Sequence, residues 1–152
     1  AIPIYGVINL HSGLLPDYRG GMATYRAMLN GDSEIASTLH FIQDSGVDTG
    51  DIISTLPIPL MADKSYLFNV LNLYAGGCKQ ILQAAAAIAA GQPLAAQSQQ
   101  GPAGYFSFPT EADLAAFFAS GQRLFERADA KWINTLDTTH DNTLNNTRHN
   151  QY

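Results

Sequence analysis

Apolar stretches in the first part of the chain have the composition of β-strands. They contain many β-branched residues, and they cover residues 2–9, 37–42 and 51–59. The first is apolar through most of its length, which is typical of a strand covered on both faces. Pro57 and Pro59 lie in the last stretch and favour a place at the edge of a sheet, because proline donates no hydrogen bond to a neighbouring strand.

Two other segments repeat apolar residues at steps of three and four, which is the pattern of a helix with one buried face. The shorter helix is expected to begin at Gly20-Gly21 and to run for about ten residues. Its apolar positions are Met22, Tyr25, Met28 and Leu29. The longer helix is expected to begin at a cap on Asp63 or Ser65 and to run to Ala90. The pair Gly76-Gly77 in its middle predicts a kink or a close contact with a neighbouring element.

These strands and helices predict an α/β fold with a mostly parallel sheet and flanking helices. Residues 1–92 would form this α/β region. Residues 93–135 are interpreted as a helical C-terminal extension, in which Thr110 and Asp113 resemble a capping box. Residues 136–152 are dominated by Asn, Thr, His and Asp, and we expect a polar, disordered tail there because so little apolar surface cannot offset the ordering entropy.

Composition narrows the classes of function. The 152 residues carry a net charge of −5, which argues against broad nucleic-acid binding. Cys78 is the single cysteine and excludes an internal disulfide and a multi-cysteine zinc site, and its apolar helical surroundings predict a buried side chain. No metal site is expected. The longest apolar run, residues 84–90, is far too short to span a membrane, so we expect no membrane partner and a cytoplasmic location.

Candidate chemistry begins where the first predicted strand ends. Asn9 and His11 are two residues apart, so their side chains lie on the same side of an extended chain. Open α/β sheets place their ligand sites at the carboxyl ends of strands. Asp48 lies in the loop after the second predicted strand, where Gly46 and Gly50 allow sharp turns. The candidate groups for a site are therefore the amide of Asn9, the imidazole of His11 and the carboxylate of Asp48.

The segment that follows Asn9 and the loop that carries Asp48 together resemble the folate-dependent formyltransferases, a family that includes methionyl-tRNA, glycinamide ribonucleotide and sugar formyltransferases. The family hallmark is N-x-H-x-S-L-L-P followed by a D-x-G loop. Asn9, His11 and Asp48 fall on its catalytic asparagine, histidine and aspartate, and Gly13 stands where the hallmark has serine. The resemblance is strong over residues 1–60 and weaker over 61–125, which corresponds to the carboxyl-terminal half of the family's catalytic domain plus an extension.

The resemblance implies that the α/β region is part of a doubly wound sheet. It also implies transfer of a formyl group from 10-formyltetrahydrofolate to an amine. His11 would act as general acid and base, Asn9 would donate a hydrogen bond to the formyl oxygen or the oxyanion, and Asp48 would orient His11 and relay protons. Gly46 and Val47 would contact the folate. Members of the family use methionyl-tRNA, a glycinamide nucleotide or amino sugars as acceptors, so nucleic acid is an expected partner only if the acceptor is a charged tRNA.

Two alternative functions stay open. The same side chains could activate water and release formate, which would make the protein a 10-formyltetrahydrofolate hydrolase. The chain could also be a truncated, non-catalytic interaction domain, because the family's first βαβ half, which would precede Ala1, is absent from it.

Other polar side chains have simpler interpretations. Arg19 could hold a phosphate or carboxylate of the acceptor, although a surface charge at the start of a helix is the plainer interpretation. His40 lies inside a predicted strand, and we expect it to be packed rather than catalytic.

Overall fold

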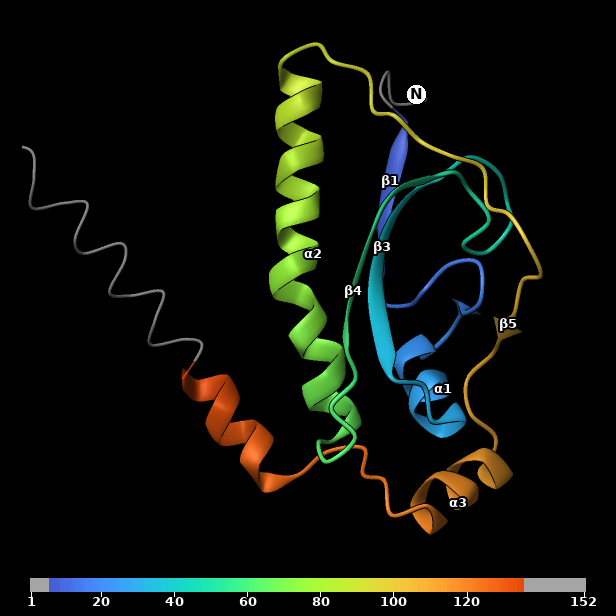
Figure 1. Cartoon of the computed structure of the whole chain (residues 1–152), viewed down its shortest axis with the longest axis vertical. Coiled ribbons are helices and arrows are strands. Elements are labelled where there is room, and N and C mark those ends of the chain that lie inside the picture. Colours follow the sequence, from blue (N-terminus) through green and yellow to red (C-terminus); the bar gives the residue numbers. More distant parts are fainter. Residues whose placement is uncertain (1–5, 136–152) are drawn as a thin grey trace, which may run out of the picture.

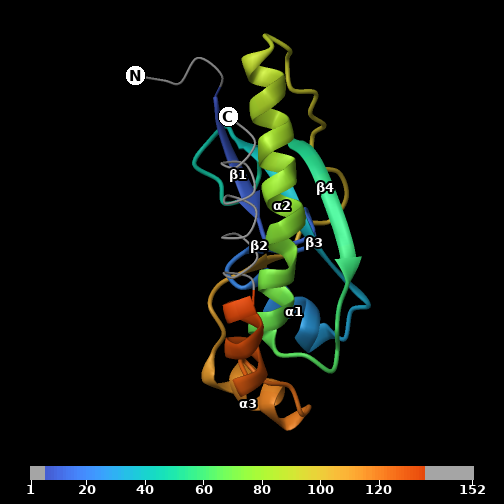
Figure 2. The ribbon, with the colours of Figure 1, turned by 90° about the vertical axis from the view of Figure 1, so that its left-hand side faces the viewer.

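The computed structural model describes residues 6–135 of the chain. A sheet of three strands lies at the centre, and its order is β1 (Val7–His11), β3 (Glu34–Ile42) and β4 (Ile52–Pro59). The long helix α2 (Tyr66–Ala89) covers one face, while α1 (Ala23–Asn30), β2 (Arg19–Gly20) and β5 (Tyr105–Phe106) lie on the other side (Figure 1). The view turned by 90° shows α2 running along the sheet in front of β1 and β3 (Figure 2). The predicted α/β class is confirmed.

The predicted parallel pairing is wrong for this sheet, because β3 runs antiparallel to both β1 and β4. The loop of residues 43–51 joins β3 to β4 without a helix, and parallel neighbours need a longer crossover. Between β1 and β3, α1 has only eight residues, about 12 Å of helix, and lies beside the end of the sheet where β1 finishes (Figure 1). The chain therefore enters β3 at that same end. The only parallel pair among the named strands joins β2 to β5.

Helix α2 begins where the sequence predicted a cap. Ser65 is the N-cap residue, and its hydroxyl accepts a hydrogen bond from the backbone N–H of Phe68. The glycine pair makes a close contact: a Cβ atom added to Gly77 would lie 2.6 Å from Cδ2 of Leu10 in β1. Side chains at this point would hold the helix away from the sheet, so the pair sets the spacing between the two layers.

The face that α2 turns to the sheet differs from the expected one at Cys78. The buried residues of α2 are Asn69, Leu73, Gly77, Gln80 and Ala84. Cys78 follows Gly77 by one residue, which turns its side chain by about 100° around the helix, and it is exposed. The prediction that Cys78 is buried is therefore wrong within the part of the chain that the structure describes.

The extension after α2 returns to the first part of the chain. Residues 105–106 form β5, which pairs with β2, and α3 (Glu111–Ala119) follows. The capping box at its start is confirmed: Thr110 accepts from the N–H of Asp113, and the Asp113 carboxylate accepts from the N–H of Thr110. Phe117 of α3 packs on Tyr25 of α1 with ring centroids 4.5 Å apart, and both rings are fully buried. This cluster joins the extension to α1.

Three further expectations concern the C-terminal tail, the edges of the sheet and membrane-spanning helices. The predicted disordered tail, residues 136–152, lies outside the described residues. Strand β4 is at an edge of the sheet, as its prolines predicted, and β1 is at the other edge among the described strands. No helix within residues 6–135 is both long enough and apolar enough to span a membrane.

Candidate active site

Strand register places three polar side chains on one face of the sheet. Asn9 and His11 alternate with Leu10 in β1, and Asn9 is paired directly with His40 of β3. Directly paired residues of antiparallel strands point to the same face. Ser37, on the opposite parity of β3, hydrogen-bonds to Gln80 of α2, so the Asn9 face is the one turned away from α2.

Asp48 reaches this face from the loop between β3 and β4. We call residues 43–51 the Asp48 loop. Asp48 has a φ of 54°, in the left-handed region, which costs a non-glycine residue about 1–2 kcal/mol. Hydrogen bonds hold it there: the backbone N–H of Gly20 donates to Oδ2 over 2.8 Å, and the side chain of Gln99 donates to the Asp48 carbonyl over 2.7 Å.

The Asp48 carboxylate lies among the three side chains of the sheet. Asn9 Nδ2 is 3.4 Å from its Oδ1, His40 Nε2 is 3.4 Å from the same oxygen, and His11 Nδ1 is 3.5 Å from Oδ2. Burial alone raises the pKa of the Asp48 carboxyl. The contact with His40, the N–H of Gly20 and the charge of His11 together outweigh burial and hold that pKa below its usual value. Asp48 is therefore a carboxylate at neutral pH.

The two histidines have different hydrogen-bond partners. His11 Nε2 lies 2.6 Å from the Tyr18 carbonyl and Nδ1 faces Asp48, so both contacts are satisfied only when both ring nitrogens carry hydrogen. His40 Nδ1 lies 2.9 Å from the Phe41 carbonyl and must donate to it, while Nε2 lies 3.1 Å from Asn9 Nδ2 and 3.4 Å from Asp48 Oδ1. Each ring therefore donates to a backbone carbonyl with one nitrogen and faces Asp48 with the other.

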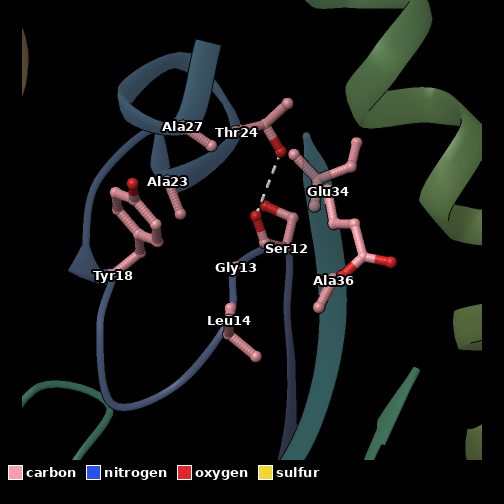
Figure 3. A pocket seen from close by; sticks show the side chains of 10 residues that line it. Ser12, Gly13, Leu14, Tyr18, Ala23, Thr24, Ala27, Glu34 and Ala36 are labelled. Atoms are coloured by element: carbon pink, nitrogen blue, oxygen red, sulfur yellow. Dashed lines mark hydrogen bonds between the residues drawn. The ribbon is translucent and has the colours of Figure 1, made fainter. Parts of the chain in front are cut away.

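The turn after β1 makes room for the His11 ring. A Cβ atom added to Gly13 would lie 2.6 Å from His11 Nε2 and would also meet Ala23. Figure 3 shows this turn from close by, with Ala23 and Thr24 of α1 facing it and the Thr24 hydroxyl donating to the Ser12 carbonyl over 3.2 Å. The ring therefore occupies the space that a serine at position 13 would need.

An open cavity of about 180 Å³ adjoins the site. It is lined by Asn9, Asp48 and neighbouring residues of β3 and the Asp48 loop, including His40, Gly46 and Val47. His11 is buried behind Asp48, with 8% of its surface exposed, and does not line this cavity. The residues expected to contact folate thus lie beside Asn9 and Asp48. Among the described residues no group of three or more His, Cys, Asp or Glu side chains could hold a metal ion.

Arg19 follows neither of the two interpretations of the sequence. Its guanidinium donates two hydrogen bonds to the side-chain oxygen of Gln99, over 3.0 and 2.6 Å. Gln99 comes from the polar segment between α2 and β5, in which the sequence shows no motif. Arg19 therefore supports the Asp48 loop indirectly, through Gln99, which binds the Asp48 carbonyl.

Comparison with known proteins identifies the first part of the chain. Residues 1–67 match the model of the formyl transferase family. The chain is also 38% identical, over 82 residues, to the methionyl-tRNA formyltransferase of Chromobacterium violaceum, an alignment that covers 54% of this chain and 26% of that protein. The first part of the chain is therefore similar to the formyl transferase family. The resemblance inferred from the sequence is confirmed.

Two further relatives show how far the similarity extends. The methionyl-tRNA formyltransferase of Halothermothrix orenii is 52% identical over 52 residues, which cover 34% of this chain and 16% of that protein. The N-formyltransferase of Helicobacter canadensis, solved with folinic acid and dTDP-3-aminofucose, is similar with a TM-score of 0.62 and 27% identity over 67% of this chain and 38% of that one. The chain thus spans about a quarter or less of the length of these curated relatives.

Two residues of the site, His40 and Gln99, were not predicted from the sequence. His40 is packed, as expected, but its ring contacts both Asn9 and Asp48. The signal was present, because an antiparallel pairing of the two predicted strands would have placed a β3 residue opposite Asn9. Gln99 gave no signal, because its role depends on a contact with residues about fifty positions away in the chain.

Proposed function

We propose that this chain carries the acyl-transfer centre of a formyltransferase that moves a formyl group from 10-formyltetrahydrofolate to an amine. The observation that supports it most is the meeting of Asn9, His11 and Asp48 within 3.5 Å contacts beside an open cavity. The relatives named above are methionyl-tRNA and amino-sugar formyltransferases, and one was solved with folinic acid. Gly46 and Val47 are the proposed folate contacts.

The proposed reaction begins when the acceptor amine attacks the formyl carbon. The carbonyl oxygen becomes an oxyanion, and the amine nitrogen must lose a proton. Asp48, as a carboxylate on the cavity wall, would accept that proton through a water molecule. The tetrahedral intermediate then collapses, the bond to the folate nitrogen breaks, and that nitrogen takes up a proton.

Asn9 and His11 would stabilise the charge that develops. The Asn9 amide has two hydrogens, one directed at His40 over 3.1 Å and one at Asp48 over 3.4 Å. The longer contact is the one that it would give up to donate to the oxyanion. His11, with hydrogen on both nitrogens, would supply positive charge behind Asp48 and return a proton to the leaving nitrogen through it.

The experiment that tests this function measures tetrahydrofolate release by the complete protein with and without amine acceptors. Methionyl-tRNA and a dTDP-amino sugar are the two acceptors to compare, because their formyltransferases are among the relatives. The variant His11→Ala should abolish transfer while folate binding stays nearly intact, since the imidazole acts on charge present only in the transition state.

Other outcomes distinguish the remaining candidates. Release of tetrahydrofolate without an amine, together with formate, would favour the hydrolase, because water would then be the acceptor. If the complete protein released nothing with any acceptor, and His11→Ala bound folate as the unchanged protein does, the non-catalytic interaction domain would remain.

A further inference from the structure

Gln99 lies in an irregular segment, and both the oxygen and the nitrogen of its carboxamide make hydrogen bonds. Its oxygen accepts from Arg19 Nε over 3.0 Å and from Arg19 Nη2 over 2.6 Å. Its nitrogen donates to the carbonyls of Asp48 and Gly50 over 2.7 and 2.8 Å. A carboxamide has two hydrogens to donate, so both are used, and both are directed at the Asp48 loop.

The dipeptide Arg19-Gly20 touches Asp48 by two routes. The N–H of Gly20 donates directly to the Asp48 carboxylate over 2.8 Å. The side chain of Arg19 reaches the Asp48 carbonyl through Gln99. Strand β2, which consists of these two residues, therefore holds both the side chain and the backbone of Asp48.

The segment that carries Gln99 is itself fixed against the sheet. Gln97 forms a pair of backbone hydrogen bonds with Ile52, over 2.8 and 2.9 Å, directly after the Asp48 loop. Asp48 has a left-handed backbone, a conformation that a non-glycine residue keeps only where its surroundings determine it. The hydrogen bonds from Gln99 to the carbonyls of Asp48 and Gly50 hold the backbone in this conformation.

We propose that Gln99, oriented by Arg19, is a positioning residue for Asp48. It fixes the turn from Asp48 to Gly50 so that the carboxylate meets Asn9, His11 and the N–H of Gly20. The role in catalysis rests on the proposed function, whereas the role in placing the carboxylate does not. A loosened loop would place the carboxylate incorrectly, and an error of about 1 Å in such a group can lower turnover by up to about a hundredfold.

Two substitutions separate positioning of the loop from pairing with Arg19. Gln99→Met keeps the length of the side chain and removes all of its hydrogen bonds. Gln99→Glu keeps an acceptor for Arg19, and adds an ion pair, but turns a second oxygen toward two carbonyl oxygens. If Gln99 served only to hold Arg19, the glutamate variant would behave like the unchanged protein. We expect instead that both variants lose about ten- to a hundredfold in kcat, with little change in KM for the folate.

The position of the Asp48 carboxylate can be measured by nuclear magnetic resonance, which does not require catalytic activity. The amide proton of Gly20 hydrogen-bonds to Asp48 Oδ2, yet Gly20 has no hydrogen bond to the Gln99 side chain. Its resonance should move upfield in Gln99→Met and in Gln99→Glu. Asp48→Ala, which removes the acceptor, supplies the reference position. Gln100→Met is the control, because Gln100 is exposed and, among residues 6–135, its side chain bonds only to the Ser98 carbonyl over 3.3 Å.

The outcomes keep the two proposals apart. An unchanged Gly20 resonance in both Gln99 variants overturns the positioning role, whatever the activity. A shifted resonance in a complete protein that has no formyl transfer supports the positioning role and contradicts the proposed function. If Gln99→Met does not fold, Gln99→Asn takes its place, since its amide is one methylene too short to reach the Asp48 and Gly50 carbonyls while bonded to Arg19.

Discussion

The strand pair β1–β3 and the Asp48 loop bring side chains to the same site by different means. Asn9, His11 and His40 are placed by the regular register of an antiparallel pair. Asp48 is placed by hydrogen bonds from Gly20 and Gln99, which come from β2 and from the segment before β5. The strands position their side chains through backbone periodicity, whereas the loop depends on distant contacts.

The difference has a consequence for how substitutions act. A change in the core beneath the strands lowers the stability of the whole sheet, but it leaves the spacing of Asn9, His11 and His40 intact in every molecule that stays folded. A change at the loop contacts alters the position of one carboxylate while the sheet stays folded. The two regions should therefore separate cleanly in measurements of stability and of turnover.

The largest expected effect concerns the strands. Leu39 of β3 is 1% exposed, on the face of the sheet toward α2. Leu39→Ala should lower the free energy of unfolding by about 2–5 kcal/mol, because a cavity replaces the lost methyl groups. Urea unfolding of the variant, with Leu82→Ala as control, measures it. Leu82 is 68% exposed on α2, and its loss should change stability by no more than about 0.5 kcal/mol.

The second effect concerns the loop. Asp48→Asn keeps the shape of the side chain and removes its charge, so we expect turnover to fall on the order of a hundredfold or more while the sheet remains folded. The matched control is Asp51→Asn, because Asp51 lies in the same loop and bonds at the surface to Gln43. Equal turnover in the two variants would contradict the proposed role of Asp48.

The third effect concerns His40, which is paired with Asn9 in the sheet and also contacts Asp48 of the loop. His40→Phe fills the space of the ring but removes the polar contact of Nε2 with the Asn9 amide and the Asp48 carboxylate, so we expect about a tenfold loss of turnover, the equivalent of one hydrogen bond. His40→Gln can present an oxygen to Asn9 and should recover part of that loss. A phenylalanine variant with the turnover of the unchanged protein would show that His40 only fills space.

The regular elements could be predicted from the sequence, whereas the strand directions and the distant contacts of the loop could not. Helix α2, its cap at Ser65 and the strands come from local patterns, and so does the placement of Asn9 beside His11. The parallel sheet was predicted wrongly because strand direction depends on how α1 and the Asp48 loop connect the strands, which periodicity does not encode. Gln99 could not be found because no local pattern marks a side chain whose partners lie far away in the chain.

The smallest expected effect is the dependence of stability on pH. Burial acts to raise the pKa of Asp48, but the contacts with His40, Gly20 and His11 leave it lowered in the folded protein. A carboxyl with a lowered folded-state pKa binds its proton less readily when folded, so it stabilises the fold above the unfolded pKa, about 3.9. That contribution is lost as the pH falls through the folded pKa. One proton is involved, so the slope of the free energy of unfolding against pH cannot exceed about 1.4 kcal/mol per pH unit.

Urea unfolding from pH 6 downward should therefore show that the stability difference between the unchanged protein and Asp48→Asn shrinks on acidification. A difference that stays constant below the usual range of aspartate would mean that the loop does not hold the carboxylate in its charged form.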